Sequence, residues 1–415
     1  MALKRPAVSD RERWSELIAG LLASGRAICY FWHHMVRRRY WVDAIEGLWR
    51  DKSVVWLSGV RRVGKTFLCR SLPDVEYFDC ELPSTRRTLE DPERFLRDVA
   101  GRRIVVDEIQ RLRNPSELLK IAADYHPATR VIATGSSTLG ASRRFRDTLT
   151  DRKRDLRLTP MILQDEQEFG ARGIDHRLLH GGLPPFYLVA ERPARAFQEW
   201  LDSYWARDIQ ELFRVARRWS FLRFVELVLA QSGGVFEAAR LARPCEISRT
   251  TVVNYLRVLE DTFVVQVVRP YSARRASEIV AAPKVYGFDT GFVCLFKGWD
   301  HLRDEDRGAL WEHYVLNEYL ARAQDQRVRY WRDKRGHEVD FVLVRRDGAT
   351  VAIECKWRAA GFDARNMKAF RSRYPDGDNF VVTDDTGTSY VRDYRGVAVR
   401  FVNLPELIRC VVTGA

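Results

Sequence analysis

One octapeptide constrains the fold of this chain more than any other feature. It lies between a short apolar run, residues 54–57, and a stretch with helical character, residues 65–72. Its residues are Gly59, Val60, Arg61, Arg62, Val63, Gly64, Lys65 and Thr66. Two glycines separated by four residues and followed by Lys and Thr are typical of a phosphate-binding loop between a strand and a helix. The sequence therefore predicts an α/β core with an ATP site, and the alternative is an ordinary glycine-rich turn.

Each part of this loop has an expected role. The glycines let backbone N–H groups turn toward phosphates, and the helix N-terminus adds partial positive charge. We expect Lys65 to reach the β- and γ-phosphates and Thr66 to ligate Mg²⁺. Phe67, the next residue, is included among the residues expected to contact the nucleotide. ATP and Mg²⁺ are thus the predicted cofactors.

A second apolar run, Ile104 to Val106, ends in two carboxylates. Asp107 is placed to hold Mg²⁺, and Glu108 is placed to polarise an attacking water, as ATP hydrolysis requires. An apolar run that ends in acids is common by itself. Found 42 residues after Lys65, it is a strong partner for the phosphate-binding loop.

A third apolar run, residues 131–133, leads into Thr134, Gly135, Ser136 and Ser137. A hydroxyl at this strand end, taken as Ser136, is predicted to sense the γ-phosphate, and the alternative is a strand-end turn. Residues 141–157 carry seven basic and three acidic side chains. Arg152 is a candidate arginine finger for a neighbouring subunit, and the equally weighted alternative is a solvated basic loop.

Residues 236–271 have the pattern of a helix-turn-helix followed by a strand, as in a winged helix. Ser248 suits the N-cap of the second helix, which directs an apolar stripe inward. The side chains that lie away from this stripe are Arg249, Thr250, Asn254 and Arg257. Such a helix can enter a DNA major groove. Helix-turn-helix units also bind proteins, so both interpretations stay open.

The last part of the chain places two carboxylates and a lysine together. Glu354 and Lys356 lie two residues apart on an apolar strand and therefore share a face. If residues 346–348 form a three-residue hairpin loop with its glycine in the left-handed region, Asp340 lies opposite Glu354. Glu312, on the preceding helix, is a possible third carboxylate. The alternative is a pair of charged strand ends on a solvated face.

Three features together resemble AAA-superfamily ATPases of bacteria and archaea that carry a C-terminal domain of unknown function. They are the glycine-rich loop, the apolar run that ends in Asp107 and Glu108, and the apolar run that leads into Thr134. Family members often have a Gly-Arg pair where this chain reads Thr150, Asp151, Arg152. The missing glycine departs from the family pattern. The stretches from Gly181 to Pro184, from Tyr204 to Asp208 and from Thr251 to Glu260 also resemble the family. The resemblance implies an AAA-type core, a helical lid, a winged helix and a nuclease-like tail.

The tail motif, Asp340 with Glu354 and Lys356, resembles the PD-(D/E)xK nuclease superfamily. In that superfamily the acids hold Mg²⁺, and the lysine orients or activates water for phosphodiester cleavage. Five regions are therefore expected. They are an N-terminal helical segment (1–45), a P-loop AAA-type ATPase core (46–165), a helical lid (166–235), a winged helix (236–300) and a restriction-nuclease-like α/β domain (301–415).

The net charge and the hydropathy of the sequence indicate which partner and which location to expect. The formal net charge of +13 is consistent with a polyanionic partner such as DNA, although basic surfaces also occur without one. Residues 37–39 form a basic patch. The most apolar early stretch, 17–32, is interrupted by Arg26 and is too short to span a bilayer. We expect a cytoplasmic protein that does not insert into membranes.

These observations favour an ATP-hydrolysing AAA-type ATPase that acts on DNA as a homo-oligomer. One alternative is a nucleotide-dependent switch that recruits protein partners and has a non-cutting tail. Another is a Mg²⁺-dependent DNA nuclease regulated by ATP. The presence of Glu108 weakly favours turnover over switching.

Overall fold

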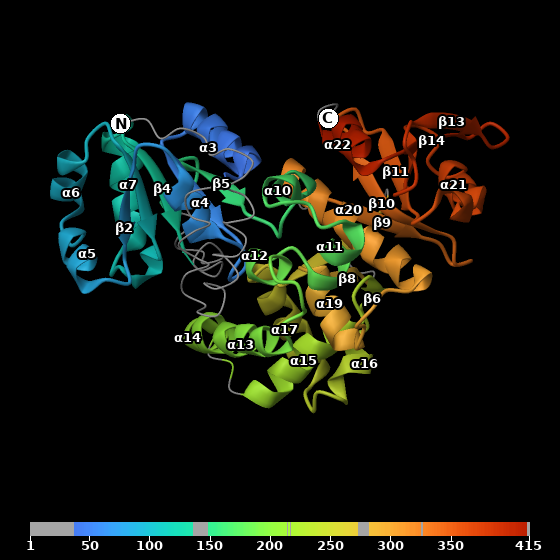
Figure 1. Cartoon of the computed structure of the whole chain (residues 1–415), viewed down its shortest axis with the longest axis horizontal. Coiled ribbons are helices and arrows are strands. Elements are labelled where there is room, and N and C mark those ends of the chain that lie inside the picture. Colours follow the sequence, from blue (N-terminus) through green and yellow to red (C-terminus); the bar gives the residue numbers. More distant parts are fainter. Residues whose placement is uncertain are drawn as a thin grey trace, which may run out of the picture.

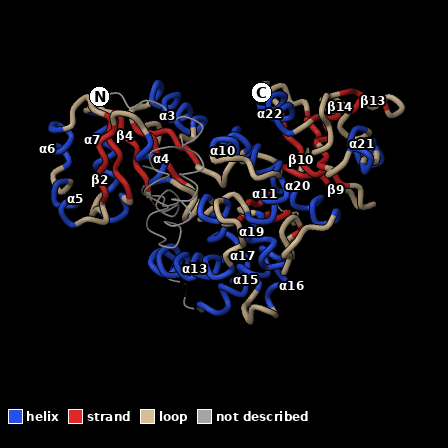
Figure 2. Tube along the Cα trace, viewed as in Figure 1, coloured by secondary structure: helices blue, strands red, loops and turns tan. Residues whose placement is uncertain are grey.

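The computed structural model describes residues 37–135, 148–213, 215, 217–272, 282–324 and 327–412. Figure 1 shows three neighbouring parts: an α/β layer built from the first strands, a group of short helices below it, and a second sheet toward the C-terminus. Strands gather in two separate places, with helices between and around them (Figure 2). The α/β class predicted from the sequence is confirmed.

The first sheet contains five parallel strands in the order β2-β3-β4-β1-β5. Its strands are β1 (Val54–Ser58), β2 (Val75–Asp79), β3 (Arg103–Asp107), β4 (Arg130–Thr134) and β5 (Lys153–Arg157). The three apolar runs are the central strands, as predicted, because a sheet covered on both faces needs apolar residues at every position. Parallel strands bring the loops after β1, β3 and β4 to one edge.

Helices cover this sheet on its two faces (Figure 1). They are α3 (Arg39–Asp51), α4 (Lys65–Ser71), α5 (Pro83–Thr88), α6 (Pro92–Asp98), the 3-10 turn η1 (Ile109–Arg111) and α7 (Pro115–Tyr125). The buried side of α3 consists of Trp41, Ile45 and Trp49. This helix begins in the expected N-terminal helical segment (1–45) and continues past its boundary to Asp51. Residues 1–36 of that segment are outside the described part of the chain.

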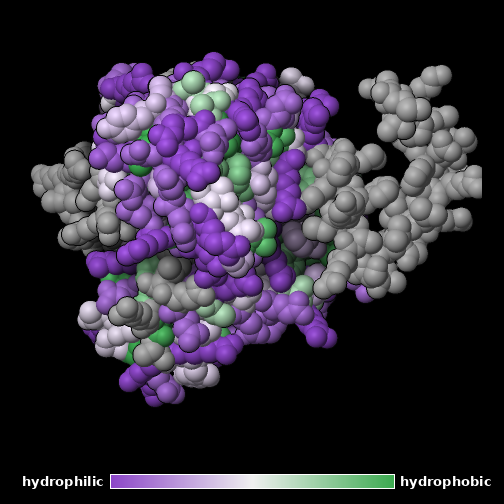
Figure 3. Space-filling model, turned by 90° about the vertical axis from the view of Figure 1, so that its left-hand side faces the viewer, coloured by the Kyte–Doolittle hydropathy of each residue, from purple (hydrophilic) through white to green (hydrophobic). Residues whose placement is uncertain are grey.

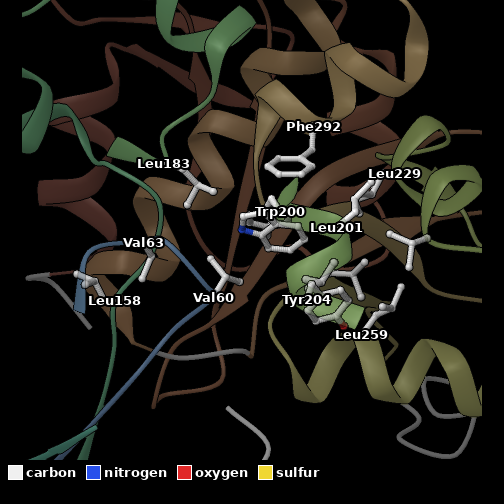
Figure 4. Close-up of a cluster of buried hydrophobic side chains, with 14 of the residues drawn as sticks. Val60, Val63, Leu158, Leu183, Trp200, Leu201, Tyr204, Leu229, Leu259 and Phe292 are labelled. Carbon is white, nitrogen blue, oxygen red and sulfur yellow. The ribbon is translucent and has the colours of Figure 1, made fainter. Parts of the chain in front are cut away.

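A helical region follows the first sheet, as the sequence predicts. Its elements are α10 (Leu163–Glu168), α11 (Ile174–His180), α12 (Pro184–Tyr187), α13 (Ala194–Tyr204), the π-helical turn η2 (Trp205–Ile209), α14 (Gln210–Phe213) and α15 (Arg218–Ala230). Aromatic side chains of α13, including Trp200 and Tyr204, are buried. Figure 4 shows them in one cluster with Val60 and Val63, so the glycine-rich loop packs against this region.

Helices and strands alternate over the next segment. The elements are β6 (Gly234–Val235), α16 (Ala238–Ala242), α17 (Arg249–Asp261), β7 (Val265–Pro270), β8 (Lys284–Gly287) and α19 (Thr290–Lys297). Ser248 caps α17 by accepting a hydrogen bond from the Thr251 backbone N–H at 3.1 Å, as predicted. Strand β8 pairs antiparallel with both β6 and β7.

The C-terminal elements complete a second, larger sheet. They are α20 (Asp304–Ala323), β9 (Arg329–Arg332), β10 (Glu338–Val344), β11 (Thr350–Cys355), the 3-10 turn η3 (Ala359–Gly361), α21 (Ala364–Arg371), β12 (Asn379–Val382), β13 (Tyr390–Asp393), β14 (Ala398–Val402) and α22 (Leu404–Val412). The strand order is β13-β14-β12-β11-β10-β9-β7-β8-β6. Because β7 pairs parallel with β9, the sheet runs across the boundary expected near residue 300.

The hairpin between β10 and β11 has the predicted register. Phe341 pairs with Ile353 and Val344 with Thr350. The Arg345 backbone N–H donates to the Ala349 carbonyl at 2.9 Å, and Gly348 has φ +87°, in the left-handed region that glycine favours. The same register, continued by one residue, puts Asp340 opposite Glu354.

One face of the molecule exposes mostly polar side chains. Figure 3 shows a largely hydrophilic face with small, separate hydrophobic patches. Within the described ranges, none of the helices combines the length and the apolar character needed to cross a bilayer.

Candidate functional site

The glycine-rich loop, residues 59–66, has the backbone that its glycines were expected to allow. Gly59 has φ +147° and Gly64 has φ +100°, both in the region that side chains disfavour. A Cβ at Gly59 would lie 2.4 Å from the Leu158 carbonyl oxygen, so only glycine fits there. Gly64 is the N-cap of α4. The N–H groups at this helix N-terminus suit an anion such as a phosphate.

Lys65 lies over the loop that precedes it. Its Nζ donates hydrogen bonds to the Gly59 carbonyl at 2.8 Å and to the Val60 carbonyl at 3.3 Å. Burial lowers the pKa of Lys65, while the nearby carboxylates of Glu108, Asp208 and Asp107 act in the opposite direction. The ammonium is therefore held beside the loop, within reach of a group bound there.

Asp107 joins three elements at the edge of the sheet. The Thr66 hydroxyl donates to its Oδ2 at 2.9 Å. The hydroxyls of Tyr77 on β2 and Thr134 on β4 also donate to this carboxylate. Burial and the charge of Asp107 together raise the pKa of Tyr77. The residues expected to hold Mg²⁺, Thr66 and Asp107, therefore lie in direct contact. An oxygen pair of this kind fits Mg²⁺.

Glu108 lies just beyond the end of β3, with φ +53°. Its backbone N–H points to Asp107 Oδ1 at 3.2 Å and to Thr134 Oγ1 at 3.3 Å. Its carboxylate accepts a hydrogen bond from the Gln110 side-chain amide. Among the residues described, the hydroxyl of Thr134 is a strand-end hydroxyl that contacts this group, whereas the residue predicted to sense the γ-phosphate is Ser136. Ser136 itself lies outside them.

A buried ion pair supports the glycine-rich loop, and it involves a residue that was predicted to lie in a basic patch. Arg38 was grouped with Arg37 and Arg39 in that patch, but it is fully buried. Its Nε donates to Asp165 Oδ1 at 3.0 Å, its Nη2 lies 2.5 Å from Asp165 Oδ2, and its Nη1 donates to the Val63 carbonyl at 3.0 Å. The basic-patch interpretation is wrong for Arg38, because α10 brings a carboxylate against it.

The helical region contacts the loop at Arg61. The Arg61 Nε donates to Asp208 Oδ2 at 3.0 Å, and the Trp200 indole N–H donates to the Arg61 carbonyl at 3.0 Å. Asp208 lies in the π-helical turn η2, a type of turn often found at functional sites. The sequence did not predict that Trp200 and Asp208 contact Arg61, because 139 and 147 residues separate them from it.

Arg152 is distant from the loop of its own chain. It precedes β5, whose first residue, Lys153, pairs with Val54 at the start of β1, while the loop follows the other end of β1. Its guanidinium donates to Asp124 Oδ1 at 2.8 Å and remains one-third exposed. It cannot act on its own nucleotide, so a finger role toward a neighbouring subunit remains a prediction.

The carboxylates of the C-terminal domain are paired with lysines. Lys356 Nζ lies 2.8 Å from Glu354 Oε2 and 3.8 Å from Asp340 Oδ2. Asp340 also accepts a hydrogen bond from the Cys355 backbone N–H at 2.8 Å. Burial, followed by the charge of Asp340, raises the pKa of Glu354 to about 8. Asp340, Glu354 and Lys356 thus converge as the hairpin register predicts.

Glu312 has a separate partner that the sequence did not suggest. Lys284, on β8, lies 3.4 Å from Glu312 Oε1 and 2.5 Å from Glu338 Oε1, and the Tyr286 hydroxyl also donates to Glu312. Burial and Asp340 raise the pKa of Glu312 to about 7. Among the described residues, no three His, Cys, Asp or Glu side chains form a group ready to hold a metal ion. Glu312, Asp340 and Glu354 remain predicted ligands.

The exposed face of α17 carries the side chains that the sequence assigned to DNA. Arg249, Thr250, Asn254 and Arg257 are all exposed, together with Val253. The opposite face is buried through Val252, Tyr255, Leu256 and Leu259. The polar face is therefore available to a partner.

Comparison with known proteins divides the chain into three matched segments. Residues 51–166 match a family model described as AAA domain. Residues 171–303 and 307–406 match two models, each described as a domain of unknown function (DUF8612 and DUF4143). Uncharacterized proteins of Mycobacterium bovis and Mycobacterium tuberculosis are each 29% identical over 336 residues, which cover 76% of this chain and 73% of each relative.

Solved structures with some likeness include a Walker-type ATPase of Pyrococcus abyssi, with a TM-score of 0.41 and 16% identity over 63% of this chain and 98% of that one. Another is AMPPCP-bound DnaA from Aquifex aeolicus, with a TM-score of 0.27 and 13% identity over 53% and 85%. The assignment follows instead from the family match and from the strand order around the glycine-rich loop. Residues 51–166 thus match an AAA domain model and combine a parallel sheet with a glycine-rich loop after its strand β1, as P-loop folds do.

Proposed function

We propose that this protein is an ATP-hydrolysing AAA-type ATPase that acts on DNA as a homo-oligomer. The observation that carries the ATPase part is the convergence of Lys65, Thr66, Asp107 and Glu108 at one edge of the parallel sheet, with Thr66 bonded to Asp107 at 2.9 Å. These groups supply a phosphate-binding cation, two Mg²⁺-compatible oxygens and a carboxylate base.

Glu108 supports hydrolysis rather than binding alone. Glu108 directly follows Asp107, and its carboxylate accepts a hydrogen bond from the Gln110 side-chain amide, whereas the Thr66 hydroxyl donates to Asp107. We assign the metal to Thr66 and Asp107, and a carboxylate beside that pair in the sequence is suited to take a proton from water. Mg²⁺, when bound, would neutralise phosphate charge, while Lys65 and the loop N–H groups orient the phosphates.

Two variants test the ATPase. Lys65→Ala is expected to lose binding of a fluorescent ATP analogue, because the ammonium that faces the phosphates is gone. Glu108→Gln is expected to keep binding within about twofold and to lose at least about a hundredfold in kcat, the contribution typical of a general base. Wild-type turnover by Glu108→Gln would refute the assigned base.

The DNA part rests on α17 and on charge. The exposed face of α17 presents Arg249, Asn254 and Arg257, and the preceding Ser248 cap orders the start of the helix. Side chains of these types suit base edges and phosphates. The net charge of +13 adds a general attraction to polyanions. The antiparallel strands β6, β7 and β8 beside α17 support a winged-helix interpretation.

An ATPase assay with single-stranded, double-stranded and branched DNA tests this part. We expect stimulation by at least one DNA form that disappears at high salt. Arg257→Ala should weaken DNA binding and reduce the salt slope by about 1. Arg195→Ala is the matched control, since Arg195 is an exposed arginine on a different helix, α13. If no DNA form stimulates the ATPase, the nucleotide-switch alternative is favoured.

Assembly into a homo-oligomer is tested by mixing inactive variants. Lys65→Ala subunits lack a working nucleotide site, and Arg152→Ala subunits lack the proposed finger. If Arg152 acts on a neighbour, a mixture of the two should regain part of the activity that each alone has lost. A monomer at all concentrations by light scattering, or no recovery on mixing, would refute the assembly or the finger.

A second candidate function, DNA cleavage by the C-terminal domain, has one specific observation in its favour. Glu354 Oε1 is buried and has no hydrogen-bond partner, next to Asp340 and Lys356. An unsatisfied buried carboxylate oxygen is costly, and a divalent cation would satisfy it. Asp340 and Glu354 would hold such an ion, and Lys356 would orient water.

Labelled DNA incubated with Mg²⁺ or Mn²⁺ tests this candidate. Cleavage by the wild type and loss of cleavage in Lys356→Ala are expected. If no DNA form is cut, or if Lys356→Ala cuts as well as the wild type, the nuclease function is refuted. The C-terminal domain would then serve binding or assembly.

A further inference from the structure

Gln110 connects the carboxylate of Glu108 to the end of the next strand. It lies in the 3-10 turn η1, directly after β3, and its side-chain amide donates to Glu108 Oε2. Its carbonyl oxygen, Oε1, lies so close to Gly135 that a Cβ there would be 2.6 Å away. Gly135 follows Thr134, whose hydroxyl contacts Asp107. One side chain therefore touches Glu108 and the segment that follows β4.

The surroundings leave Gln110 little freedom to move. A Cβ at Gly135 would also lie 2.8 Å from the Trp56 ring and 3.6 Å from the Ile109 side chain, so the absence of a side chain at Gly135 makes room for this packing. Glu108 has a left-handed backbone, φ +53°, and its N–H is engaged by Asp107 and Thr134. With the backbone fixed, the remaining freedom of Glu108 lies in its side chain, which Gln110 holds.

We propose that Gln110 is a positioning residue that holds the Glu108 carboxylate in the orientation needed to take a proton from the attacking water. The proposal deepens the proposed ATPase function and rests on it. A carboxamide donates one hydrogen bond to Glu108 Oε2 without adding charge, so Oε1 stays available to a water. By also contacting Gly135, the same side chain ties the base to the strand end where a γ-phosphate sensor is predicted.

The first test is Gln110→Ala, with kcat and the Kd of a non-hydrolysable ATP analogue measured separately. We expect kcat to fall about ten- to a hundredfold, as for loss of a hydrogen bond to a charged group. The analogue Kd should stay within about twofold, because the contacts that carry the proposal join Gln110 to Glu108 and Gly135 rather than to residues 59–66. Gln198→Ala, an exposed glutamine on α13, is the matched control and should leave both unchanged.

The second test is Gln110→Glu, which keeps the size of the side chain and guards against a folding defect in the alanine variant. Two adjacent carboxylates repel each other, which favours the protonated form. The acid limb of the pH–rate profile should therefore move to higher pH, while the melting temperature stays near the wild-type value. A residue that only supports packing would not move this limb.

A double variant separates the proposal from its premise. In a Glu108→Gln background, Gln110→Ala should cause no further loss of kcat, since residues that act as a unit are non-additive. If Glu108→Gln abolishes hydrolysis but Gln110→Ala turns over normally, the positioning role alone is refuted. Equal losses from Gln110→Ala in both backgrounds would also refute it. If Glu108→Gln hydrolyses ATP normally, the base assignment and this proposal both fail.

Discussion

Replacing Arg38 by methionine is the most informative perturbation of the glycine-rich loop. Arg38 is fully buried, makes a two-point ion pair with Asp165 and donates to the Val63 carbonyl. Methionine keeps much of the volume and removes the charge and all the donors. The substitution leaves Asp165 as a buried carboxylate without its cation, and Val63 without the donor that fixes the loop.

The magnitude follows from what remains around Asp165. Removing one partner of a buried ion pair costs about 3–5 kcal/mol. Asp165 keeps hydrogen bonds from the Trp41 indole at 3.1 Å and from the Ile162 backbone N–H at 3.1 Å, which soften the loss. We therefore expect Arg38→Met to lower the free energy of unfolding by about 3 kcal/mol, near the lower end of that range. ATP-analogue affinity should fall as well, because the loop loses its support.

Urea unfolding, with the melting temperature as a second readout, measures the change. Arg37→Met is the matched control: it removes a neighbouring arginine that is exposed, and it should change the free energy by less than about 0.5 kcal/mol. Adding Asp165→Leu to Arg38→Met should recover part of the loss, since an apolar pair can replace a buried ion pair. If Arg38→Met and Arg37→Met unfold at the same urea concentration with equal slopes, the reasoning is refuted.

Three further predictions concern single side chains. Asp208→Asn removes a negative charge that acts on Lys65, while the amide oxygen can still accept the hydrogen bond from Arg61, so ATP-analogue affinity should rise several-fold. Asp202→Asn, elsewhere in the helical region, should leave the affinity unchanged, and an equal or weaker affinity for Asp208→Asn would contradict this reasoning. Burial raises the pKa of Glu318 to about 7, so the folded state binds more protons than the unfolded state between about pH 4.5 and 7. The free energy of unfolding should therefore fall as the pH rises through this range. Glu318→Gln should make the free energy, measured by urea titration, depend less on pH. Gly59→Ala forces a Cβ to within 2.4 Å of a backbone carbonyl oxygen, and loss of ATP-analogue binding is expected by fluorescence; unchanged binding would show that the loop can adapt.

The sequence was sufficient wherever the chemistry is local or follows from strand order. The loop from Gly59 to Thr66 is continuous in the chain, so its backbone geometry is determined by its own glycines. The position of Asp107 beside the glycine-rich loop was predictable, because the carboxyl ends of parallel strands lie at the same edge of a sheet. The position of Asp340 opposite Glu354 was predictable, because a three-residue hairpin loop determines which residues of the two strands pair. The structure has that pairing.

The tertiary structure alone decided which charged side chains support these sites. Arg37, Arg38 and Arg39 are the same residue type in a row, but only the side chain of Arg38 is buried, against Asp165 of α10, while Arg37 and Arg39 are exposed. Lys284 contacts Glu312, which is 28 residues away in the chain, and Asp208 contacts Arg61, which is 147 residues away. Periodicity and spacing describe one element at a time, whereas these contacts depend on how separate elements pack. The octapeptide thus determined that the chain has a phosphate-binding loop, and the packing of α10 and η2 decided what holds it in place.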